Sequence, residues 1–217
     1  MRVEAWVVCR QCNTTWMSQL ERATKPLLVP IIKDPSKARS LSDEDAGTIA
    51  IWAILKAILV DARDVALHKS KPFVSPHQRA RFMNDLTPPD RCSVWLARQD
   101  FDNNTAGRLV ADFWIFPRVS TLRHLQVLTV TLSALQLAIQ VMVLRDLAKP
   151  KPGALHYIPD EAFRIRPKNR PWSDYLVPLH PGCEPVTGPP PRRLGQKGLN
   201  ALAYRLSGGP GKSPYRK

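Results

Sequence analysis

Two cysteines near the start of the chain are spaced as metal ligands often are. Cys9 and Cys12 stand two residues apart in the segment VVCRQCNTTWMSQLE. The β-forming residues before Cys9 predict a strand over residues 2–9 and a turn over residues 9–12, and Asn13 is a good N-cap for a helix to about residue 25. A Cys-x-x-Cys turn between a strand and a helix is typical of a zinc knuckle, so we expect a structural Zn²⁺ bound by Cys9 and Cys12.

The cysteine pair supplies two of the four ligands that a structural zinc needs. His180 and Cys183, spaced His-x-x-Cys, would complete a Cys₃His site, although Pro181-Gly182 between them equally predicts a plain turn. A thioredoxin-like redox pair would begin its helix at the first cysteine and lie in a βαβ unit, which the pattern does not predict. A zinc site that is weak or lost, and two incidental cysteines, both stay open.

The sequence contains no pattern that assigns a catalytic residue. The five histidines are isolated from one another, no glycine-rich phosphate loop follows a predicted strand, and no helix carries a metal-binding histidine pair or paired carboxylates. Whether the protein is an enzyme is therefore left open. The histidines are His68, His77, His124, His156 and His180.

Basic residues exceed acidic ones by a wide margin. The chain has 32 Lys and Arg against 18 Asp and Glu, and from residue 149 onward it has 13 basic and 4 acidic residues, a net charge of +9. Such a surplus favours a polyanionic partner, of which nucleic acid is the commonest, while general solubility is the alternative. We expect non-specific phosphate contacts from Arg10, Arg192, Arg193, Lys197, Lys212, Arg216 and Lys217.

Periodicity predicts further helices and strands. Pro26 and Pro30 should end or kink the first helix, and Ser42 should cap the next, whose apolar stripe spans residues 46–60 and encloses Lys56, expected to extend its ammonium to the surface. A helix over 76–85 and strands over 92–98 and 109–116 should follow. The uncharged residues 125–144 fit a β-hairpin, an amphipathic helix or, least well, a membrane span.

The amino-acid composition of the chain changes at about residue 149. Prolines become dense, which predicts extended segments up to a short helix over 195–206, and the Gly- and Pro-containing tail 207–217 should be disordered. Four scattered cysteines and no apparent signal peptide favour a reducing, cytoplasmic location.

Several segments together resemble a broad family of bacterial and phage proteins described as HNH-endonuclease-like or uncharacterised. The helix with Trp52, Ala53 and Lys56 resembles the family's Trp-Ala-x-x-Lys helix. The other matching segments are VVCRQCNTTWMSQLE with KPLLVPII, PPDRCSVWLAR, TLSALQLAIQV and PVTGPPPRRLGQKGLNALA. The resemblance implies a hairpin over 125–144, Cys9 and Cys12 as zinc ligands, and Asn13 at the opening of the helix.

Longer members of that family carry an upstream Cys-x-x-Cys and histidine, which together with the second pair resemble a treble-clef nuclease finger. This chain begins at the second pair, so the resemblance implies an incomplete or inactive nuclease finger. Family positions usually occupied by Gly and Trp hold Thr15, His180 and Gly188 here.

We therefore expect an α+β protein: a partial treble-clef finger over 1–33, helices packed on a mostly antiparallel sheet over 40–206 with a Pro-rich basic wrap from about 149, and the basic tail. The leading hypothesis is an HNH-nuclease-related nucleic-acid-binding protein. The alternatives are a protein-interaction or accessory module with a vestigial zinc knuckle, and a binding pocket in the sheet domain.

Overall fold

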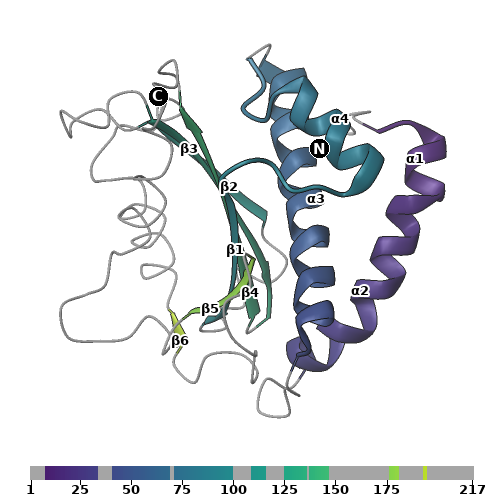
Figure 1. Ribbon diagram of the computed structural model, residues 1–217. Helices are drawn as coiled ribbons and strands as arrows, with labels where there is room; N and C mark the ends of the chain where they lie inside the picture. The colour runs from purple at the N-terminus through teal and green to yellow at the C-terminus, as the bar shows by residue number, and fades with distance from the viewer. Residues whose placement is uncertain are drawn as a thin grey trace.

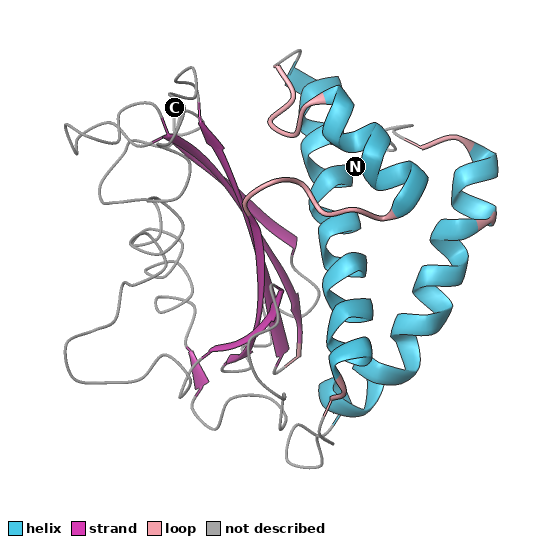
Figure 2. Ribbon diagram, in the orientation of Figure 1, coloured by secondary structure: helices cyan, strands magenta, loops and turns pink. Residues whose placement is uncertain are grey.

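Helices cover one face of a mostly antiparallel sheet, so the expected α+β class is confirmed (Figures 1 and 2). The computed structural model describes residues 8–33, 41–68, 71–99, 109–115, 125–135, 137–146, 176–180 and 193–194. Helix α3 lies against the sheet, and α2 packs on the other side of α3. The Pro-rich wrap and the tail predicted after residue 149 lie almost entirely outside the described residues.

The first helical segment differs from the sequence prediction. Helix α1 (Arg10–Thr14) begins after Cys9, which is its N-cap, so Asn13 lies inside the helix rather than at its start. Residues 8 and 9 form no strand, and residues 2–7 lie outside the described part. The reason is local. The Cys9 sulfur accepts a hydrogen bond from the backbone N–H of Cys12, as an N-cap side chain does, so the helix begins before Asn13.

Helix α2 (Trp16–Lys33) continues through both Pro26 and Pro30, so of the two predicted outcomes, an end or a kink, the end of the helix is wrong. The two prolines are four residues apart and both are exposed, which leaves the carbonyls that lose their partners near water. The opposite side of the helix buries Leu28 and Ile31, and this packing on α3 outweighs the lost hydrogen bonds.

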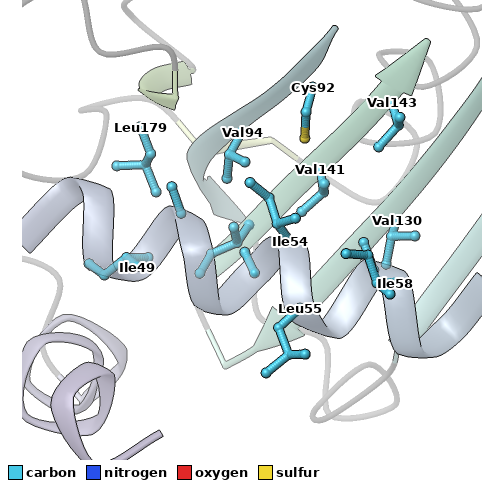
Figure 3. Close-up of a cluster of buried hydrophobic side chains, with 14 of the residues drawn as sticks. Ile49, Ile54, Leu55, Ile58, Cys92, Val94, Val130, Val141, Val143 and Leu179 are labelled. Atoms are coloured by element: carbon cyan, nitrogen blue, oxygen red, sulfur yellow. The ribbon is translucent and has the colours of Figure 1, made fainter. Parts of the chain in front are cut away.

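Helix α3 (Asp43–His68) is capped as predicted: Asp45 N–H donates to Ser42 Oγ at 3.1 Å. Its residues are buried on two sides because α2 and the sheet both pack against it, as Ile49, Ile54 and Ile58 illustrate (Figure 3). The ammonium of Lys56 forms an ion pair with Glu21 of α2, so its charge is not left unpaired among the apolar residues.

The sheet contains the two strands expected and the hairpin that periodicity left ambiguous. β1 (Cys92–Gln99) and β2 (Leu109–Ile115) match their predictions within one residue, and residues 125–144 form the hairpin of β3 (Leu125–Ala134) and β4 (Leu137–Asp146). With β5 (Leu176–His180) the strand order is β2-β3-β4-β1-β5, and the short β6 (Arg193–Leu194) pairs parallel to β1. No helix among the described residues is long and apolar enough to cross a membrane.

Strand alternation gives the sheet two different faces. Val94, Val130, Val141 and Val143 point toward Ile54 and Ile58 of α3 and form the main core with them (Figure 3). The intervening residues face away from the helices, and several of them are polar but still buried. These residues are Ser93, Trp95 and Ala97 of β1, Thr129, Thr131 and Ser133 of β3, and Ala138, Gln140 and Met142 of β4.

A buried carboxylate fixes the connection between α3 and α4 (Pro76–Asp85). Asp61, whose side chain is 2% exposed, accepts hydrogen bonds from the backbone N–H groups of Phe73 and Val74, each at 2.9 Å. It also accepts one at 2.6 Å from Arg79 of α4, whose Nε donates to the Val74 carbonyl. The four groups form a closed network in which the buried charge is fully bonded.

We expect Asp61→Ala to reduce the free energy of unfolding by about 3 to 5 kcal/mol, because it leaves two backbone donors and the Arg79 guanidinium without their acceptor. Urea unfolding followed by circular dichroism measures this. The matched control is Asp64→Asn on the same helix, whose more exposed pair with Arg63 should contribute about 0 to 1 kcal/mol. Equal losses in the two variants would contradict the structural role of Asp61.

Candidate functional site

Cys9 and Cys12 lie side by side at the N-terminus of α1. The backbone N–H of Cys12 donates to Cys9 Sγ at 3.2 Å, and the backbone N–H of Asn13 donates to the Cys9 carbonyl at 3.1 Å. Cys9 is exposed and Cys12 is partly buried. The segment therefore holds two thiols in a fixed local geometry that a soft metal ion or an oxidant can reach.

The two thiols differ in acidity because they share hydrogen bonds. The pKa of Cys9 is lowered from its ordinary value, first by the hydrogen bond from the Cys12 thiol and then by the one from the Cys12 backbone N–H. The pKa of Cys12 is raised, mainly because its thiol serves as the donor to Cys9. Cys9 is thus the thiol that deprotonates first, and thiolate is the form that binds metals and attacks electrophiles.

The helix does begin at the first cysteine, as the helix of a thioredoxin-like redox pair does. This feature therefore no longer separates a metal pair from a redox pair. The surrounding fold still separates the two kinds of pair. A redox pair of this type lies in a βαβ unit, whereas the long strands among the described ones pair antiparallel and none of the described strands flanks α1 in that way.

The structure does not bring His180 to the cysteine pair. His180 ends β5 beside Val94, and β5 and α1 lie on opposite sides of α3 (Figure 1). Cys183 lies outside the described residues, and the described ones contain no cluster of three His, Cys, Asp or Glu side chains arranged to hold a metal ion. Cys92 is buried in the core, where burial raises the pKa of its thiol, so it is unsuited to either role.

The α1–α2 unit has an exposed basic surface that sequence reasoning recognised only at Arg10. Arg22 and Lys25 stand three residues apart on the exposed side of α2, and within the described parts of the chain neither they nor Arg10 form an ion pair. Glu21 is the single acidic residue of these helices, and Lys56 neutralises it. The helical spacing of Arg22 and Lys25 was the signal that could have found them.

The structure does not describe the side chains of the other predicted phosphate-binding residues. Arg193 is in β6, where its backbone pairs with Arg98, and its side chain is not described. Arg192, Lys197, Lys212, Arg216 and Lys217 fall outside the described residues.

Comparison with known proteins gives no relative: no protein-family model, no curated protein and no solved structure matches this chain. The resemblance to HNH-endonuclease-like proteins therefore stays a prediction. The functional argument rests on the side chains of the protein itself.

We expect Cys9 to react with iodoacetamide several-fold faster than Cys12 near neutral pH, because its lowered pKa gives it the larger thiolate fraction. In Cys12→Ala the largest cause of the lowered pKa is lost, so the pH profile of Cys9 alkylation should move to higher pH. Peptide mapping by mass spectrometry over time and pH measures both effects. Cys92 serves as the buried internal control, and faster labelling of Cys12 than of Cys9 would contradict the assignment.

Proposed function

We propose that this chain is a nucleic-acid-binding protein whose α1–α2 unit is half of a zinc finger related to those of HNH endonucleases. The observation that carries the proposal is the combination of the paired thiols of Cys9 and Cys12 with the exposed, unneutralised cations Arg10, Arg22 and Lys25 on the same two helices. A metal pair next to a basic helix is an arrangement suited to holding that helix against phosphates.

The cysteine pair fits half of a tetrahedral zinc site. Cys9 and Cys12 come from adjacent turns of backbone, and the N–H of Cys12 already stabilises negative charge on Cys9 Sγ. A structural zinc, when bound, would supply no reaction chemistry but would tie α1 to whichever segment provides the remaining ligands. Cys9 and Cys12 would then fix the orientation of α1 and, through it, the position of Arg10.

The expected mode of nucleic-acid binding is contact with the phosphate backbone. The cations Arg10, Arg22 and Lys25 are each exposed on α1 and α2, and the basic residues after 149 would add further contacts along an extended Pro-rich segment. Contacts to phosphates do not read the base sequence, so little sequence preference is expected. If the excess charge served solubility alone, nucleic-acid binding would not depend on the positions of the cations.

We expect the purified protein to bind less than one equivalent of zinc, or to lose it readily, because two thiols are too few for a closed site. Elemental analysis and competition with a chelating dye measure this. Cys9→Ser/Cys12→Ser should remove the binding, whereas His180→Ala should not change it, since β5 lies across α3 from α1. A firmly held equivalent of zinc that His180→Ala and Cys183→Ala abolish would instead establish the Cys₃His site.

We expect the affinity for a short fluorescent DNA duplex to fall steeply with salt. The slope of log K against log salt changes by roughly 0.9 for each phosphate contact, so Arg22→Ala/Lys25→Ala and Arg192→Ala/Arg193→Ala should each reduce it by up to about two. The charge-matched control is Arg63→Ala/Lys71→Ala, which removes the same charge from around the end of α3. If the control variant reduces the slope as much as the two test variants do, the salt dependence comes from net charge alone and not from these positions.

A further inference from the structure

The cysteine pair lies on an outer surface of the protein, where a second molecule can reach it. Helix α1 is at the outer edge of the helical layer, on the side of α3 that faces away from the sheet (Figure 1). None of the five residues of α1 is buried, Cys9 before it is exposed, and Cys12 is partly buried. A metal ion bound by the two thiols can therefore take further ligands from another molecule.

The cysteine content of the chain limits how a zinc site at this pair can be completed. The sequence has four cysteines, and besides the pair these are Cys183 and Cys92, of which Cys92 is buried in the core. One copy can therefore place at most three cysteines at the metal, and its fourth ligand would have to be of another residue type. Two copies supply four thiolates from two identical pairs, which is a complete Cys₄ site.

Arg10 favours a four-thiolate site electrostatically. A zinc ion with four thiolate ligands keeps two excess negative charges. Arg10 lies between the two cysteines in sequence, and among the described residues it forms no ion pair. Two copies bring two Arg10 guanidinium groups to the metal centre, and these offset its excess charge.

Apolar side chains close to the pair fit an interface between two copies. Phe82 holds the end of α4 against the start of α2, because its ring lies edge-on to Trp16 with centroids 6.4 Å apart. Trp16 is four residues after Cys12, and both pack onto the same core. Met83 and Leu86, which follow Phe82, are 50% and 37% exposed. A second copy bound at the cysteine pair would add apolar contacts with this region to the metal bonds.

We propose that two copies of this chain bind one zinc ion between them, through Cys9 and Cys12 of each copy. The two pairs are related by a two-fold axis through the metal, since most homodimers use the same surface patch on both subunits. The inference rests on the zinc-binding half of the proposed function, for which it names the missing partner. The dimer also doubles the number of cations that one nucleic acid can contact.

The test measures the mass of the purified full chain by light scattering, without nucleic acid. A reducing agent that does not bind zinc is present, so that no disulfide joins two copies. With zinc the mass should be twice the 24.4 kDa of one chain, and elemental analysis should find one zinc for every two chains. Removing the zinc with a chelator should return the protein to the mass of one chain, because the metal bonds hold the two copies together.

Variants separate the cysteine pair from the rest of the chain. Cys9→Ser/Cys12→Ser should stay monomeric at every zinc concentration while its circular dichroism stays that of the wild type, since both positions lie on the surface. Cys183→Ser, the matched control, should still form the dimer with zinc. A tagged wild-type chain should retain untagged wild type only when zinc is present, and should not retain the double variant.

Three results would overturn the proposal. A monomer that firmly binds one zinc per chain would place the remaining ligands within a single copy, and the zinc half of the proposed function would then stand without this inference. A chain that binds no zinc would overturn the inference and that half together. A dimer that persists after chelation, or in Cys9→Ser/Cys12→Ser, would mean that zinc does not join the copies.

Discussion

The fold depends on the buried carboxylate of Asp61 because it joins the two helices on which the rest of the helical layer is built. Its hydrogen bonds to Phe73, Val74 and Arg79 fix where α4 begins relative to α3. Helix α4 in turn presents Phe82, which is 1% exposed and lies edge-on to Trp16 with ring centroids 6.4 Å apart. Trp16 begins α2 directly after α1, so the position of the cysteine pair depends on this chain of contacts.

Much of the fold was predictable because its signals are local. The cap and acidic first turn of α3, the Ser75-Pro76 start of α4 and the strands β1 and β2 each depend on a few neighbouring residues. One error arose where tertiary packing opposes local preference. Pro26 and Pro30 favour a helix end, but the burial of the opposite side of α2 against α3 keeps the helix intact.

The candidate site was predictable in its residues but not in its geometry. Cys-x-x-Cys spacing identified Cys9 and Cys12, yet the start of the helix depends on whether the Cys9 sulfur accepts the Cys12 N–H, as it does, or the Asn13 side chain accepts a backbone N–H two or three residues after Asn13. Helical spacing places Asp61 in line with Ile54 and Ala57, but the hydrogen bonds that stabilise its carboxylate could not be predicted, because its backbone partners are 12 and 13 residues away. Long-range acceptors of this kind require the structure.

The polar residues of 125–144 show how one pattern supports two structures until the turn is known. Thr129, Ser133 and Gln140 follow helical spacing and would form one stripe on a helix. In the hairpin the turn at Leu135 reverses the chain, and the same residues converge on one face of two adjacent strands. The converged groups differ from Asp61 in their hydrogen bonding. The Asp61 carboxylate has its hydrogen bonds within the protein and so explains its own burial. Among the described residues the amide of Gln140 has no such partner, so the described part of the chain does not by itself explain the burial of this side chain.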